Sequence, residues 1–151
     1  PAARLGGAEG VLTDEQVRAF VRGQLDAVDL DGRSVCILVP DGTRTCPLPL
    51  LLGAVHTALS ERVSRMTTLI ALGTHQPMTG AAIARHLGFT EGALEATYPG
   101  MTVLNHEWWL PESFADLGTI PTARLAALSE GPQIGQLIRR MRPRWRATRA
   151  T

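Results

Sequence analysis

The sequence predicts a three-layer α/β domain in which parallel strands are connected by crossover helices. Three short apolar runs, at residues 34–39, 66–72 and 101–104, have the length and composition of strands. The first run is continuous, which is typical of a strand buried on both faces. The connections between the runs are long enough to recross a sheet, which favours parallel pairing. Hydrophobic residues make up 44% of the 151 positions, so we expect a sizeable core and exclude a disordered chain.

The first two helices have recognisable starts. Thr13 and Gln16 have the spacing of a capping box and predict a helix over residues 14–28. Pro47 suits the first turn of a crossover helix, which is expected to run to about residue 63. Apolar residues recur at spacings of three and four in both segments, so each helix should present one apolar stripe.

Later helices are predicted from caps and turn residues. Thr79 can cap a helix over residues 80–87, which Gly88 ends. A shorter helix over residues 91–97 precedes the third strand, and another is expected over residues 121–130. Strands and helices that alternate with right-handed crossovers predict a Rossmann-like arrangement.

The chain divides into an N-terminal extension over residues 1–11, the α/β domain over residues 12–131 and a tail over residues 132–151. Residues 139–151 hold six of the chain's fifteen arginines and no acidic residue. Clustered arginines can bind nucleic acid, but we interpret the tail as solvated, disordered chain and expect no nucleic-acid partner.

Composition also bears on location. No apolar run reaches the roughly 18 residues that a membrane span needs, and no charged and apolar leader opens the sequence. Cys36 and Cys46 are expected to be free thiols, as in a reducing compartment. We therefore expect a cytoplasmic protein with no membrane partner.

Polar loops follow all three predicted strands, at the edge where open α/β sheets bind ligands. Asp41, Thr43 and Arg44 follow the first strand, His75 the second and His106 the third. The planar guanidinium of Arg44 can hold a carboxylate or phosphate with two hydrogen bonds, and Asp41 could orient it. Either histidine could transfer a proton near neutral pH. Because parallel order brings these loops to one edge, we predict a site for a small anion there.

Each residue also has a plainer interpretation. Asp41 could bond the backbone of its own turn while Arg44 stays solvated, and either histidine of the loops could be structural. His56 and His86 lie within predicted helices, and we interpret both as packing or helix-end residues. No metal site is predicted, because HExxH, CxxC and paired HxH spacings are absent. The lack of GxGxxG and Walker loops argues against a dinucleotide or P-loop site.

The three loops together resemble a known family. Asp-Gly-Thr-Arg at 41–44 followed by Pro47, Gly-Thr-His-Gln-Pro at 73–77 and Asn-His-Glu-Trp at 105–108 are similar to the amino-terminal domain of the nickel-dependent lactate racemases. The resemblance runs from about residue 12 to about residue 131. It implies an isomerase that racemises 2-hydroxy acids with a nickel-pincer nucleotide, whose pyridinium ring accepts a hydride from the substrate.

The resemblance also implies roles for the loop residues. Arg44 would clamp the substrate carboxylate, and Asp41 and Thr43 would shape its loop. His75 would take or return the hydroxyl proton, and His106 would serve the opposite face of the planar intermediate.

The chain departs from the family where the cofactor is held. The family attaches the nucleotide to a lysine and completes nickel coordination with a later histidine, whereas this sequence contains no lysine. It also lacks the glycine-rich cofactor segment and the C-terminal domain that closes the site. We therefore expect no cofactor-binding or metal-binding residue in this chain. The expected function is the substrate-binding N-terminal domain of a racemase, truncated and inactive without its C-terminal domain. The alternative is a non-catalytic module that binds a small carboxylate or phosphate.

Overall fold

A computed structural model of the chain describes residues 3–7, 10–116, 118–119, 121, 123–124 and 146–148. They belong to two compact units, one within residues 1–106 and the other within residues 107–151. Most of the helix predicted over residues 121–130 and most of the arginine-rich tail lie outside the described residues, so both remain predictions.

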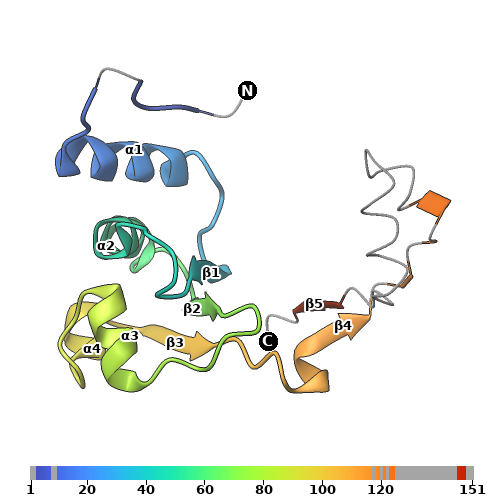
Figure 1. The fold of residues 1–151 in the computed structure, drawn as a ribbon. Coiled ribbons are helices and arrows are strands. Elements are labelled where there is room, and N and C mark those ends of the chain that lie inside the picture. Colours follow the sequence, from blue (N-terminus) through green and yellow to red (C-terminus); the bar gives the residue numbers. More distant parts are fainter. Residues whose placement is uncertain are drawn as a thin grey trace. The chain divides into compact units, whose positions relative to one another are not determined.

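The first unit contains a parallel sheet of three strands. These are β1 (Ser34–Pro40), β2 (Arg65–Ala71) and β3 (Met101–Asn105), in the order β1-β2-β3 (Figure 1). Pro40 is in register with Ala71, and Ile70 with Asn105. The carboxyl ends of all three strands therefore lie at one edge of the sheet. The predicted α/β class with parallel strands and crossover helices is confirmed.

Helices alternate with these strands. They are α1 (Asp14–Asp26), α2 (Leu48–Leu59), α3 (Gly80–Leu87) and the single turn α4 (Leu94–Thr97). The capping box before α1 is confirmed, because Thr13 Oγ1 accepts from Gln16 N and Thr13 N donates to Gln16 Oε1. The helices α1 and α2 end earlier than predicted, since the apolar pattern continues past their last hydrogen-bonded turns.

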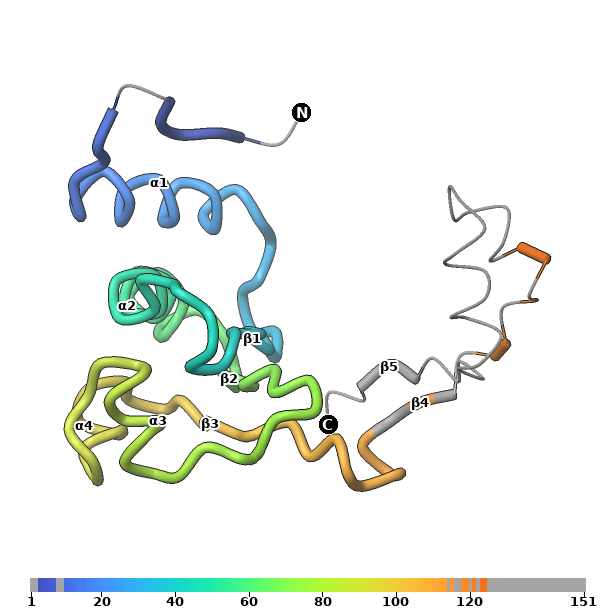
Figure 2. Tube along the Cα trace, viewed as in Figure 1, coloured from blue at the N-terminus to red at the C-terminus, as the bar shows by residue number. Residues whose placement is uncertain are grey.

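The described helices cover one face of the sheet. Strands in sequential order with right-handed crossovers place both crossover helices on the same side. Burial agrees, because Val39, Met66, Ile70 and Met101 on one face are nearly inaccessible to solvent. The helix α2 packs against both α1 and α3, and Figure 2 shows it between them.

The opposite face of the sheet is open among the described residues, which corrects the prediction that the first strand is buried on both sides. Cys36 is exposed, and the side chain of Leu38 is 65% exposed. Leu38, Leu69 and Leu104 are in register across the three strands, and they form a row that we call the outer leucine row. An apolar run in the sequence cannot show which face of the sheet is covered, because that depends on which side of the sheet the crossover helices pack. The second helical layer of the predicted three-layer arrangement is not among the described residues.

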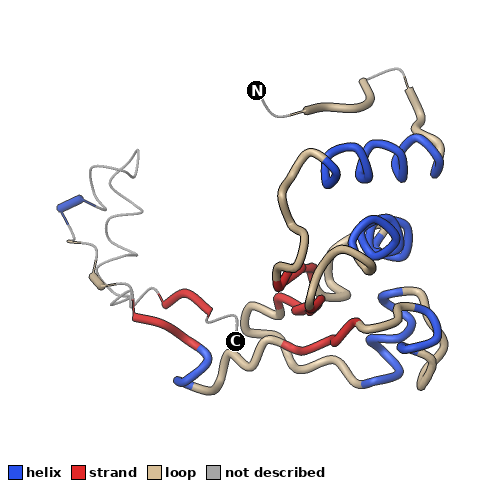
Figure 3. The backbone as a smooth tube through the Cα atoms, turned by 180° about the vertical axis from the view of Figure 1, so that it is seen from behind, coloured by secondary structure: helices blue, strands red, loops and turns tan. Residues whose placement is uncertain are grey.

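The second unit contains a short antiparallel pair of strands. A 3₁₀ turn at Pro111–Ser113 leads into β4 (Phe114–Asp116), which pairs with β5 (Arg146–Thr148) (Figure 3). The strand β5 lies inside the tail, where the sequence indicated no strand. None of the helices in the described part of the chain is long and apolar enough to cross a membrane.

Candidate functional site

A hollow of about 360 Å³ opens at the carboxyl ends of β1 and β2. Its floor consists of the last residues of both strands, and its polar side chains come from the loops that follow. Asp41, Thr43 and Arg44 line it from the first loop, and His75 lines it from the second. Four of the five predicted site residues therefore meet in one place, at the predicted edge of the sheet.

Asp41 is the buried centre of this hollow, with 7% of its surface exposed. Its Oδ1 accepts from the backbone N of Thr43 at 3.1 Å and from Thr43 Oγ1 at 2.6 Å. Its Oδ2 lies 2.5 Å from His75 Nδ1. The hydrogen bonds from Thr43, and then the one from His75, lower the pKa of the Asp41 carboxyl to about 2. Asp41 is therefore ionised at neutral pH.

The charge of Asp41 determines how His75 is arranged. An ionised carboxylate can only accept hydrogen bonds, so Nδ1 of His75 carries the shared proton. In the neutral ring, Nε2 is then the atom able to accept a proton. The side chain of His75 is 55% exposed, so the ring is held at one end while remaining accessible to solvent. A carboxylate that orients a histidine in this way is the arrangement used in general base catalysis.

Arg44 is exposed at the mouth of the hollow. Its backbone N donates to Asp41 O at 3.2 Å, which closes the turn. Asp41 accepts from Thr43 and His75 and forms no ion pair with the guanidinium, which agrees with the plainer interpretation that Asp41 bonds the backbone of its own turn while Arg44 stays exposed. Among the described residues, no hydrogen bond or ion pair engages the guanidinium, so its donors can meet an anion.

His106 is not among the residues that line the hollow. It follows β3 directly, and its backbone N donates to Ile70 O at 3.0 Å, so it continues the edge of the sheet beside β2. Since β2 lies between β1 and β3, a hollow between the ends of β1 and β2 does not include it. The prediction that the strands are parallel placed all three loops at one edge of the sheet, but it did not show which strand ends are close enough to share a hollow.

Two further residues support these loops, and neither was predicted to do so. His86 in α3 lies with Nε2 2.9 Å from Pro40 O, at the start of the Asp41 loop. Asn105 at the end of β3 bonds the backbone of Met78 in the His75 loop. The interpretation of His86 as a helix-end residue missed this contact because its partner is 46 residues away in sequence.

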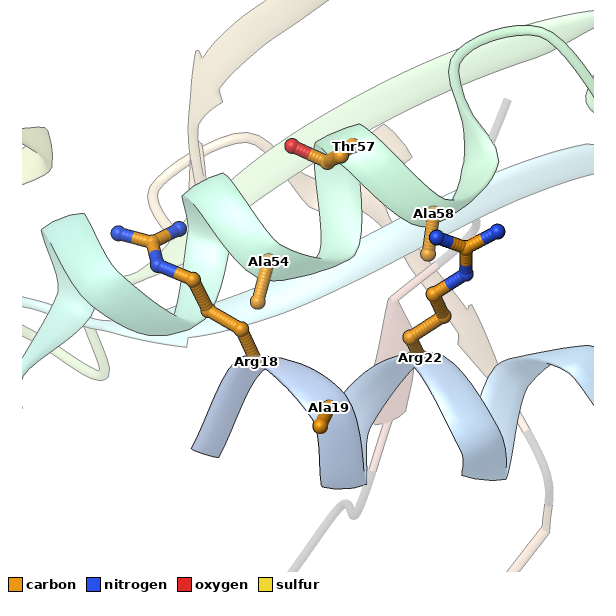
Figure 4. A pocket seen from close by; sticks show the side chains of 6 residues that line it. All are labelled: Arg18, Ala19, Arg22, Ala54, Thr57 and Ala58. Carbon is orange, nitrogen blue, oxygen red and sulfur yellow. The ribbon is translucent and has the colours of Figure 1, made fainter. Parts of the chain in front are cut away.

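A second hollow, of about 290 Å³, lies between α1 and α2. Figure 4 shows Arg18 and Arg22 rising from α1 on either side of a floor of small residues. The residues that line it are Arg18, Ala19, Arg22, Ala54, Thr57 and Ala58. It contains no histidine or carboxylate, so it offers charge without a group that transfers protons. The hollow at the strand ends is therefore the candidate site.

The described residues do not fit a resident metal or a covalently held cofactor. No group of three or more histidine, cysteine, aspartate or glutamate side chains among them could hold a metal ion, and the whole sequence contains no lysine. What the site does offer is an exposed guanidinium and an oriented histidine that line the same hollow.

Comparison with known families identifies the domain. The model of the lactate racemase N-terminal domain matches residues 17–124. The chain belongs to this family. The match includes both loops of the hollow and all three parallel strands.

A solved structure supports the fold of this lactate racemase N-terminal domain. It is a Thermotoga maritima protein determined by a structural genomics consortium, with 24% sequence identity and a TM-score of 0.65. The alignment covers 78% of this chain and 27% of that chain. The chain thus spans about a quarter of the length of its structural neighbour. Comparison with curated proteins finds no match.

Proposed function

We propose that this chain is the substrate-binding N-terminal domain of a racemase that acts on small 2-hydroxy carboxylates. The observation that carries the proposal is that Arg44 and the Asp41–His75 pair line one hollow. A 2-hydroxy acid presents a carboxylate and a hydroxyl on adjacent carbons. A site for it needs a cation and a group that exchanges protons, a short distance apart.

The proposed roles follow from the chemistry of these side chains. Arg44 holds the substrate carboxylate with two parallel hydrogen bonds. His75 accepts the proton of the 2-hydroxyl at Nε2, and the ionised Asp41 stabilises the imidazolium that results. The proton returns from the same atom when the hydroxyl is restored. Thr43 holds the Asp41 carboxylate in place through its hydroxyl.

Racemisation also requires hydrogen to leave and rejoin the substrate carbon, and the residues described here supply no acceptor for it. We propose that a nickel-pincer nucleotide accepts and returns this hydrogen, and that it is held by a domain outside the 151 residues of this sequence. On this proposal the N-terminal domain is inactive by itself and cytoplasmic. The role of His106 on the opposite face of the intermediate remains a prediction.

Binding can be tested on the chain as it exists. Titrating the ¹⁵N-labelled protein with lactate should shift the backbone signals of the loops at residues 41–44 and 73–77. Arg44→Ala should weaken binding about 10- to 100-fold, since a hydrogen bond to a charged group contributes about 1.5–3 kcal/mol. Arg18→Ala is the matched control in the other hollow and should leave the Kd unchanged.

Two outcomes would overturn the binding proposal. Lactate-induced shifts confined to α1 and α2 would place the anion in the second hollow. An unchanged Kd in Arg44→Ala would remove the carboxylate clamp.

The catalytic part of the proposal needs the cofactor-bearing domain of a related racemase, added to this chain. Racemisation should appear only in the mixture, and His75→Ala should abolish it while leaving lactate binding within a few-fold of the wild type. Binding with no racemisation in the mixture would instead favour the non-catalytic carboxylate-binding module.

A further inference from the structure

Hydrogen bonds at several points hold the loop that carries His75. It spans the residues between the end of β2 and the start of α3. Near its beginning, His75 N donates to Leu72 O at 2.9 Å. At its end, Thr79 accepts from Ala82 N and caps α3. Between these points, the backbone of Met78 is hydrogen-bonded to the last residue of β3.

Both hydrogen bonds of the Met78 backbone go to one side chain, that of Asn105. Met78 N donates to Asn105 Oδ1 at 3.1 Å, and Asn105 Nδ2 donates to Met78 O at 2.9 Å. A carboxamide is the side-chain group that offers a donor and an acceptor side by side, as a neighbouring strand would. Asn105 is the last residue of β3 and is in register with Ile70 of β2, so the third strand fixes the loop that follows the second.

Met78 extends this connection to the first loop. A methyl group added at Gly42 would lie 3.8 Å from Met78 Cε, so the end of the methionine side chain lies close to the turn that presents Asp41. The same two loops are joined by the hydrogen bond between His75 and Asp41. The two loops are therefore close together at Met78 and at the Asp41–His75 pair, and Asn105 holds the backbone of Met78.

We propose that Asn105 is a positioning residue that holds the His75 loop so that the imidazole Nδ1 meets Asp41. Asn105 does not line the hollow, and it acts through the Met78 backbone. The inference rests on the proposed function only in that it concerns the same hollow. It assigns a role in the site to β3, although that strand contributes no residue to the lining.

The test uses a spectroscopic signature that does not require a ligand. Neutral histidine in water favours the tautomer protonated at Nε2, whereas the bond to Asp41 requires the proton on Nδ1. The ¹⁵N chemical shifts of the imidazole distinguish the two tautomers. In the wild-type chain we expect the Nδ1–H form of His75 to predominate, and Asp41→Asn should remove that preference.

Asn105→Leu is the informative variant, since it keeps the size of the side chain and removes both hydrogen bonds without adding charge. We expect the Nδ1–H form of His75 to fall from the major to the minor species, with weakened lactate binding. Arg62→Ala is the control for general destabilisation, because it removes hydrogen bonds far along the sheet from this edge. It should leave the tautomer unchanged.

The outcomes separate this inference from the proposed function. A wild-type tautomer ratio in Asn105→Leu, or the same loss in Arg62→Ala, overturns the positioning role whether or not lactate binds. A lost Nδ1–H form in a chain that never binds lactate supports the positioning role and refutes the proposed function. If Asn105→Leu does not fold, Asn105→Ser is too short to reach Met78 and provides the same readout. Failure of both to fold, as judged by circular dichroism, overturns the inference in favour of a general structural role.

Discussion

Replacing Gly88 with alanine should destabilise the domain more than the same replacement at any other turn glycine of the first unit. Gly88 caps α3 in the left-handed region, with φ of +81°, and its N donates to Ala84 O. A Cβ at this position would lie 2.6 Å and 2.8 Å from Pro49 Cβ and Cγ. The side chain of proline is rigid, so the first turn of α2 and the end of α3 would have to separate.

The expected loss has two parts. The left-handed conformation costs an alanine about 1–2 kcal/mol, and forcing atoms into a packed contact costs about 1–3 kcal/mol more. Gly88→Ala should therefore lower the free energy of unfolding by about 2–5 kcal/mol. Gly32→Ala is the matched control, because φ is +69° and no atom lies within 4 Å of the added methyl group. It should lose only the conformational part.

Urea unfolding followed by circular dichroism measures both variants against the wild type. The comparison depends on the difference between the two losses, which isolates the contact with Pro49 from the backbone penalty. Equal losses in Gly88→Ala and Gly32→Ala would refute the reasoning, since the packing of α2 against the end of α3 would then tolerate the methyl group without cost.

Three other predictions concern single side chains. Because the folded pKa of Asp41 is about 2 against an ordinary 3.8, its stabilising effect should be complete above about pH 4 and lost as the pH falls through about 2. Urea unfolding across this range should show the gap between wild type and Asp41→Asn closing, and a constant gap would contradict the lowered pKa. Arg62 donates to Leu25 O, Val28 O and Asp31, so Arg62→Ala should cost about 1–3 kcal/mol. Arg62→Lys should not restore that loss in the same unfolding assay, because one ammonium cannot span three acceptors. Thr68 is fully buried and its hydroxyl donates to Met101 Sδ, a weak acceptor. Thr68→Val should thus change the unfolding midpoint little or raise it, whereas a loss above about 2 kcal/mol would indicate a stronger partner for the hydroxyl.

Local signals in the sequence were sufficient to predict the helices and strands that position the site. The capping box at Thr13, the cap at Thr79 and the left-handed glycine at Gly88 each depend on residues within a few positions, and each has the predicted form. The loops that follow the three strands were predicted to lie at one sheet edge, because connections of this length favour parallel pairing. The sequence alone therefore places Arg44 and His75 at one edge of the sheet.

These local signals could not predict contacts between residues that are far apart in the sequence. The partner of Asp41 is His75, 34 positions away, and that of Pro40 is His86, 46 positions away. Which side chain meets which loop depends on where α3 lies relative to the strand ends, and hydrophobic periodicity carries no information about that position. The same limit explains why the sequence did not predict strand β5, whose pairing partner β4 is about 30 positions away.

The outer leucine row affects how the protein behaves at the concentrations that spectroscopy needs. Two chains meeting through this face would withdraw the exposed side chains of Leu38 and Leu104 from water, at about 25 cal/mol for each Å² removed. Such self-association would broaden resonances and compete with ligand in every titration. Leu104→Lys, at a residue that is 46% exposed and faces away from the helices, should keep the sample monodisperse while leaving the hollow at the strand ends unaltered, since Leu104 does not line it.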